Sequence, residues 1–105
     1  MLVNSGSKFK KDDTVSLKNI LGEEMVATYV SEDETTYTVK DVHALGMGEK
    51  GLQFMPCIMS GDVSGETTIQ RIHYLWVVPA KNEITAAYSQ TVTGIAVPAK
   101  PSIIV

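Results

Sequence analysis

The residues that could support nucleophilic chemistry are one cysteine, Cys57, and two histidines, His43 and His73. A nucleophilic thiol needs a base within hydrogen-bonding reach and a third group that orients the base. Cys57 lies in the middle of the apolar run LQFMPCIMS, which favours an inert thiol in a core or an interface. His73 lies among apolar strand residues and His43 near a strand end, which favours structural and surface roles. We therefore predict no catalytic residue.

Metal and acid–base chemistry would need clusters of ligands or of carboxylates. One cysteine and two distant histidines do not match the ligand spacing of a zinc site. The carboxylates of Glu32, Asp33 and Glu34 share one short segment, which is typical of a solvated turn. The glycine-rich segment GMGEKG at 46–51 lacks the Gly-Lys-Ser/Thr ending and the following helix of a phosphate loop. The sequence predicts no enzyme, no cofactor and no metal.

The composition is that of one small globular domain. The chain has 105 residues, of which 44% are hydrophobic and 20% charged, and its net charge is −3. Proteins that bind nucleic acid mainly through phosphates are usually basic, so a broad electrostatic surface for DNA is disfavoured. Four lysines near the N-terminus leave two alternatives, a local basic patch or a solvated tail. They are Lys8, Lys10, Lys11 and Lys18.

The sequence has no feature of a membrane or secreted protein. The N-terminal segment MLVNSGSKFKK lacks the apolar region of a signal peptide. No run of about 18 apolar residues is present, so no transmembrane helix is expected. A single cysteine fits a reducing compartment. We expect a cytoplasmic protein without a membrane partner.

Alternating apolar residues predict three strands in the first half of the chain. Val15 and Leu17 alternate with polar neighbours, and Gly22 then permits a turn with positive φ. The run MVATYV at 25–30 is rich in β-branched and aromatic residues, and TTYTVKDV at 35–42 alternates with period two. An acidic turn separates these two runs, so the three strands form a meander.

The two following strands are apolar on both faces. The run LQFMPCIMS at 52–60 contains Pro56, which belongs on a sheet edge or at a bulge. The run TTIQRIHYLWVV at 67–78 is the predicted fifth strand. An edge strand with two apolar faces needs a cover, and a second subunit is the simplest one. The expected subunit-contact residues are Met55, Cys57, Met59, Ile72, Tyr74 and Trp76.

A helix is predicted over 82–93. Asn82 suits the N-cap, Glu83 the first turn, and Gly94 the position after the last turn, with apolar residues at helical spacing between them. The predicted organisation is a flexible arm over 1–13, a barrel over 14–79, and a C-terminal region over 80–105 that holds the helix and an extended tail. Short strands joined by tight turns favour a small, strongly bent all-β barrel of five strands.

These elements resemble a known family. VSLKNILGEEMVATYVSEDETTYTVKDV looks like the first Sm motif of Sm/LSm proteins, and TTIQRIHYLWVV resembles the second. The chain is most similar to Sm-like proteins of marine cyanophage and ocean-metagenome origin, through GEE, the VA pair, FMPCIM and a helix after Pro79. The resemblance covers roughly residues 14–98. Its matching apolar and glycine positions are Val15, Leu17, Gly22, Met25, Tyr29 and Val39.

The resemblance implies a fold and an assembly. Sm proteins are strongly bent, SH3-like five-stranded barrels, and they form homo-oligomeric rings, here expected to have about five to seven subunits. In such rings the fourth strand of one subunit pairs with the fifth strand of its neighbour. The resemblance also implies single-stranded RNA as a ligand. Tyr37 would then stack on a base and Arg71 would contact phosphate.

The sequence departs from the Sm pattern where RNA would bind. The segment from Glu32 to Tyr37 has no Met-Asn pair, Arg71 is not followed by glycine, and the helix follows the barrel instead of preceding it. Two functions therefore remain open. The first is a ring that binds single-stranded RNA in phage or host RNA metabolism. The second is an oligomeric structural or protein-interaction module of phage origin that does not bind nucleic acid.

Overall fold

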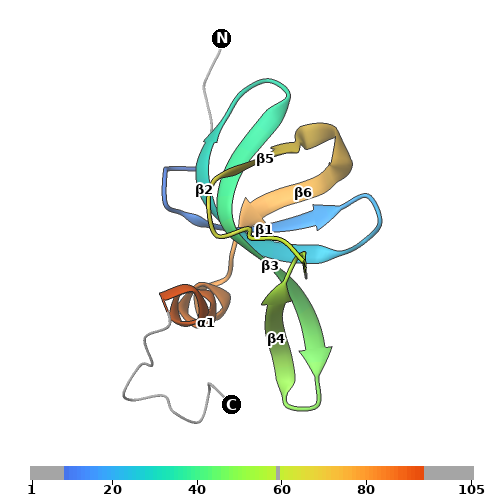
Figure 1. Cartoon of the computed structure of the whole chain (residues 1–105), viewed down its shortest axis with the longest axis vertical. Coiled ribbons are helices and arrows are strands. Elements are labelled where there is room, and N and C mark those ends of the chain that lie inside the picture. Colours follow the sequence, from blue (N-terminus) through green and yellow to red (C-terminus); the bar gives the residue numbers. More distant parts are fainter. Residues whose placement is uncertain (1–8, 59, 94–105) are drawn as a thin grey trace.

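The described part of the chain forms an antiparallel β-sheet and a C-terminal helix (Figure 1). This computed structural model describes residues 9–58 and 60–93. The prediction of a β protein with a short C-terminal helix is confirmed, although the described sheet has six strands instead of five. The strands are β1 (Thr14–Asn19), β2 (Glu24–Glu32), β3 (Thr36–Gly48), β4 (Gly51–Pro56), β5 (Thr67–Gln70) and β6 (Tyr74–Pro79).

The long strand β3 pairs with three other strands, β2, β4 and β5. From β1 to β4 each strand pairs with the next along the chain, and β6 returns to pair with β1. The first residues of β3, Thr36 to Val39, also pair with β5. The chain then crosses to β6 through the 3-10 helix η2 (Arg71–His73). No ladder joins β5 to β6 among the described residues, so the sheet is open there.

The prediction of one continuous strand over 67–78 is wrong, because η2 divides it into β5 and β6. The physical reason is that β5 pairs with β3 while β6 pairs with β1, so the chain must turn a corner between two edges. Backbone hydrogen bonds hold both ends of the corner. The amide of Arg71 donates to the carbonyl of Thr35 at 2.9 Å, and the amide of Ile20 donates to the carbonyl of His73 at 2.9 Å.

The core lies between the strands of this bent sheet. The predicted alternation of β1 is confirmed, since Val15 is fully buried and Leu17 nearly so while the residues beside them are partly exposed. Gly22 has φ +89°, as the predicted turn after β1 requires. The buried cluster consists of Phe9, Val15, Leu17, Met25, Ala27, Tyr29, Val39 and Val42.

Phe9 lies in the segment for which the sequence predicted a flexible arm, yet it is buried. Its ring centroid is 5.3 Å from that of Tyr29 on β2. The amide of Asp12 donates to the carbonyl of Tyr29 at 2.8 Å, and the amide of Tyr29 donates to the carbonyl of Asp13 at 2.8 Å. Residues 9–13 therefore belong to the folded part of the chain.

β3 and β4 form a long hairpin that extends away from the rest of the sheet (Figure 1). The glycine-rich segment 46–51 contains the turn of this hairpin, but the turn itself consists of Glu49 and Lys50, because Gly46 and Gly48 lie within β3. Glycine fits inside this strand because a side chain from the partner strand fills the space beside it. A Cβ at Gly46 would lie 3.1 Å from Cε of Met55 on β4.

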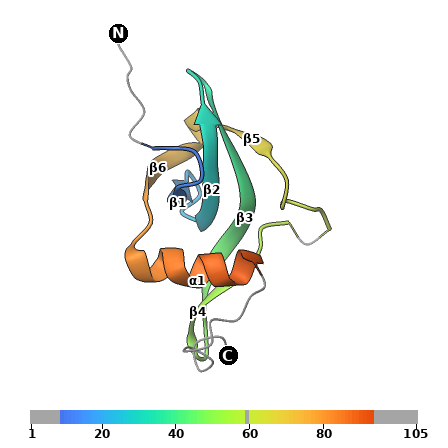
Figure 2. The ribbon, with the colours of Figure 1, turned by 90° about the vertical axis from the view of Figure 1, so that its left-hand side faces the viewer.

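Helix α1 (Asn82–Thr93) has the range that the sequence predicted. Gly94, expected just after the helix, and the predicted tail lie outside the described residues. Figure 2 shows that α1 crosses the sheet where β3 leaves it and enters the hairpin with β4. Tyr88 is the buried residue of the helix.

Candidate functional site

The structure brings the two predicted RNA-contact residues together. Tyr37 is the second residue of β3, and Arg71 opens η2 directly after β5, which pairs with this end of β3. The guanidinium carbon of Arg71 lies 4.7 Å from the centroid of the Tyr37 ring. A guanidinium at this distance is attracted to the face of the ring. The pair therefore forms a joined cationic and aromatic surface at one corner of the sheet.

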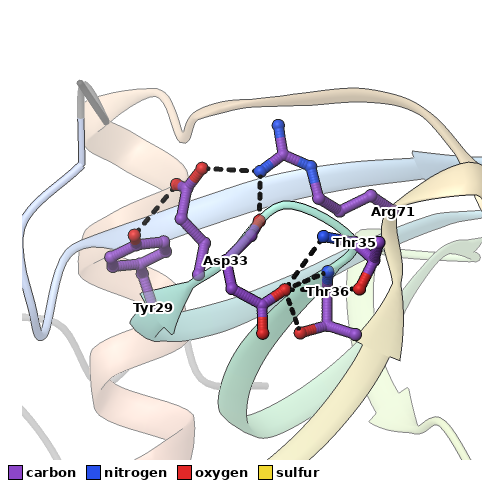
Figure 3. A network of polar contacts seen from close by, with 6 residues as sticks. Tyr29, Asp33, Thr35, Thr36 and Arg71 are labelled. Atoms are coloured by element: carbon purple, nitrogen blue, oxygen red, sulfur yellow. Dashed lines mark hydrogen bonds and ion pairs between the residues drawn. The ribbon is translucent and has the colours of Figure 1, made fainter. Parts of the chain in front are cut away.

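The charge of Arg71 is already compensated within the protein. Its Nη1 donates to Oε2 of Glu32 at 2.8 Å and to the backbone carbonyl of Asp33 at 2.8 Å (Figure 3). Glu32 is the better shielded partner, with a side chain that is 19% exposed against 37% for Arg71. The hydroxyl of Tyr29 donates to Oε1 of Glu32 at 2.9 Å and so orients the carboxylate. A phosphate that approached Arg71 would have to compete with Glu32.

Asp33 organises the turn that carries these residues. Its Oδ1 accepts hydrogen bonds from the amides of Thr35 and Thr36 and from both hydroxyls, as Figure 3 shows. The Thr35 amide is the main reason that the pKa of the Asp33 carboxyl lies below its usual value, and the hydroxyl and amide of Thr36 act in the same direction. The turn between β2 and β3 is therefore built around a carboxylate that stays ionised.

The sequence did not reveal Glu32 and Tyr29 as parts of this site. Glu32 was placed in a solvated acidic turn, whereas it ends β2 directly opposite Tyr37 in the ladder. Arg71 is 39 residues further along the chain, so no local spacing could have paired it with Glu32. The pairing register of β2, β3 and β5 brings Arg71 next to Glu32, and this register is a property of the folded sheet that no short stretch of sequence shows.

Two groups of large apolar side chains are exposed. The first group lies on the turn after β1, on η2 and on β6, and we call it the β6 surface. The second group lies on the β3–β4 hairpin and just beyond β4, and we call it the hairpin surface. Leu21 and Ile72 are each 79% exposed and Trp76 is 59% exposed. The β6 surface consists of Ile20, Leu21, Ile72, Leu75, Trp76 and Val78. The hairpin surface consists of Met47, Leu52, Met55 and Ile58, of which Met47 and Leu52 pair in the ladder and Met55 lies on the opposite face of β4.

The predicted subunit-contact residues divide between these surfaces and the core. Ile72 and Trp76 lie on the β6 surface and Met55 on the hairpin surface. Tyr74 is partly buried and packs against the core, and burial raises the pKa of its hydroxyl. A shift in the β1–β6 register between Tyr74 and Trp76 accompanies the inward position of Tyr74, which strict alternation does not predict. Met59 lies outside the described residues.

Cys57 is exposed beside the hairpin surface. Its thiol donates to the sulfur of Met25 at 3.5 Å, which ties the end of β4 to the core strand β2. Loss of hydration, with a smaller effect from the negative charge of Glu23, raises the pKa of the thiol. The neutral thiol is thereby favoured, which disfavours nucleophilic chemistry.

The described residues contain neither a metal-binding cluster nor a membrane-spanning helix. In residues 9–58 and 60–93 no three histidine, cysteine or acidic side chains are grouped so that they could hold a metal ion. Across the same ranges, no helix has the length and apolar character needed to cross a membrane. No family model matches the sequence, and no curated protein matches it.

Proposed function

We propose that this chain is an Sm-like module that assembles with copies of itself into a ring and acts as a structural or protein-interaction unit. The observation that carries the proposal is the pair of sheet edges. β4 and β6 end the described strand order, and both carry large exposed apolar side chains. An uncovered edge of this kind favours pairing with another strand.

A second copy of the chain is the occupant that fits both edges. The backbone N–H and C=O groups on the free edge of a strand can pair with another strand in place of water, and each copy supplies both β4 and β6. The two edges belong to different elements, so contact between them is head-to-tail, and head-to-tail contacts close into a ring when the rotation allows. The apolar positions on which the resemblance to Sm proteins rests all lie in the core, which supports the same assignment.

The test of assembly is the mass of the purified chain in solution, measured by light scattering. We expect a mass of several chains for the native protein, because burial of the β6 and hairpin surfaces should favour association. Trp76→Glu and Leu52→Lys each place a charge in one of these surfaces and should yield monomers.

The control is Ser89→Glu, which adds a charge at an exposed position of α1 outside both surfaces and should leave the mass unchanged. A native protein that is monomeric at all concentrations would contradict the proposal. So would a Trp76→Glu variant that retained the native mass.

The second candidate function is binding of single-stranded RNA by the same assembly. The observation that favours it is the Tyr37–Arg71 pair, since stacked arginine and tyrosine side chains can contact both a base and its phosphate. The ion pair of Arg71 with Glu32 and the net charge of −3 oppose it.

Fluorescence anisotropy with short U-rich and A-rich RNA, at low and moderate salt, tests this candidate. If Arg71 contacts RNA, Arg71→Ala should weaken binding several-fold. Glu32→Gln should strengthen it by a similar factor, because the competing carboxylate is lost while its shape is kept. Absence of binding by the native protein at low salt would exclude this candidate, since phosphate contacts are strongest there.

A further inference from the structure

Helix α1 meets the sheet through one deeply buried side chain, that of Tyr88, which is 2% exposed. Its hydroxyl donates to the backbone carbonyl of Asp41 at 2.8 Å and lies 3.4 Å from that of Lys40. The Thr28 hydroxyl lies 2.8 Å from the oxygen of the Tyr88 hydroxyl and can donate to it. One side chain of the helix is thus bonded to both β2 and β3.

The ring of Tyr88 reaches further, onto the hairpin. Its centroid lies 5.9 Å from that of His43 on β3 and 6.2 Å from that of Phe54 on β4, both in edge-to-face geometry. Burial is the main reason that the pKa of Tyr88 is raised to about 12, so the hydroxyl stays protonated and can donate throughout the physiological range.

The bond to Asp41 falls at the bend of β3. In the β2–β3 ladder Val26 pairs with His43 and Thr28 with Lys40, so two residues of β3 oppose Ala27 alone. This is a β-bulge, which bends its strand. Asp41 has φ 53°, a left-handed backbone conformation that residues other than glycine adopt infrequently. Contacts with the surrounding residues therefore help to keep the backbone in this conformation.

Two donors converge on the carbonyl at this bend. The hydroxyl of Tyr88 contacts the oxygen of Asp41 at 2.8 Å and Nδ1 of His43 contacts it at 2.9 Å. Just beyond the bend, His43 and Ala44 pair with both β2 and β4, and β3 then leaves β2 and continues into the hairpin with β4. In Figure 2, α1 lies across this part of β3. The Tyr88 hydroxyl of α1 therefore binds the bend that sets the direction of the hairpin.

We infer that Tyr88 is a positioning residue, through which helix α1 fixes the direction of the β3–β4 hairpin and so presents the hairpin surface to a second copy of the chain. Only the last step rests on the proposed function. The fixing of the hairpin follows from the hydrogen bond of Tyr88 to the bend and from its ring contacts with both hairpin strands.

The first test is hydrogen exchange of the full chain in a Trp76→Glu background, which removes any effect of assembly. Tyr88→Phe keeps the ring and loses the bond to Asp41. We expect amides of residues 43–56 to exchange about three- to tenfold faster, the range that a net hydrogen bond contributes, while those of β1 stay unchanged.

The matched control is Thr28→Val, which removes the Thr28 bond to Tyr88 and leaves the bond from Tyr88 to Asp41. It should leave the exchange of residues 43–56 as it is. If both variants accelerated these amides equally, or if Tyr88→Phe accelerated β1 as much as the hairpin, Tyr88 would be an ordinary packing residue and the inference would be overturned.

The second test measures assembly in the otherwise native chain. We expect Tyr88→Phe to raise the concentration at which the assembly dissociates by about the same three- to tenfold factor. An unchanged midpoint would overturn the coupling to assembly. If instead Trp76→Glu left the native mass unchanged, the proposed function would fail, and the exchange experiment would still decide the role of Tyr88.

Discussion

Asp33 is the residue whose ionisation matters most directly for local structure. Four hydrogen bonds from two threonines converge on one carboxylate oxygen, and together they lower the pKa of the group from its usual 3.8. A group whose pKa is lower in the folded chain stabilises the fold above its unfolded pKa. This contribution is lost as the pH falls through the folded pKa, so it belongs to the acid limb of the stability curve.

Asp33→Asn tests this assignment, because the amide keeps an acceptor oxygen and removes the charge. We expect the variant to have a lower Tm than the native protein at pH 6, and the difference to shrink as the pH falls below 3.8. Thermal unfolding followed by circular dichroism between pH 2.5 and 6 gives the Tm of each protein as a function of pH. A difference in Tm that is constant over this range would show that the charge of Asp33 has no role.

At the same scale, the candidate site could be only half predicted. Tyr37 and Arg71 were expected to act together, and the structure places them in contact. The partner that neutralises Arg71 was not expected, because Glu32 becomes its neighbour only when β5 pairs with β3 and η2 turns the chain. A local sequence pattern can identify a candidate arginine or tyrosine. The charged residue that lies opposite it depends on the strand register, which the pattern does not contain.

At the scale of elements, strands and helices with a clear period were predicted well. The alternation of β1 and the helical spacing of α1 both reflect burial of one face, and both elements have this property in the structure. The length of the hairpin could not be predicted, because a glycine-rich segment such as 46–51 is typical of a turn, although glycine is accepted inside a strand where a cross-strand side chain fills the space. The corner at η2 was missed because it depends on two distant edges.

The segment before β1 provides a prediction at this scale. Phe9 is buried against Tyr29 although it precedes the first strand, so Phe9→Ala should remove a core side chain. We expect a loss of about 3 kcal/mol in the free energy of unfolding. Urea denaturation measures it, with Lys10→Ala at the exposed neighbouring position as the control. A loss below about 0.5 kcal/mol, the usual range of surface changes, would mean that this segment is not part of the core.

At the scale of the whole molecule, the exposed apolar side chains set the expected solution behaviour. The β6 and hairpin surfaces hold ten large apolar residues that are exposed in the single chain. Large exposed apolar patches are typical of surfaces that bind another molecule. The net charge of −3 disfavours long-range electrostatic attraction of anionic partners.

If the chain assembles with copies of itself as proposed, its stability depends on its concentration. A tenfold rise in protein concentration should stabilise each chain by about 1 kcal/mol and raise the Tm by about 4 °C. Differential scanning calorimetry over two decades of concentration measures this slope. Trp76→Glu should abolish it. Equal slopes for the two proteins would show that the β6 surface takes no part in association.

The pairing of β1 with β6 also has a consequence for synthesis. Val15 pairs with Pro79, so one edge of β1 can be completed only when nearly the whole described chain has been made. β1 ends at Asn19 and β6 begins at Tyr74. At ~5–20 residues per second, the ribosome needs roughly 3 to 11 seconds to span that interval. During these seconds β1 and β2 can pair as a hairpin, while the other edge of β1 is not yet paired with β6.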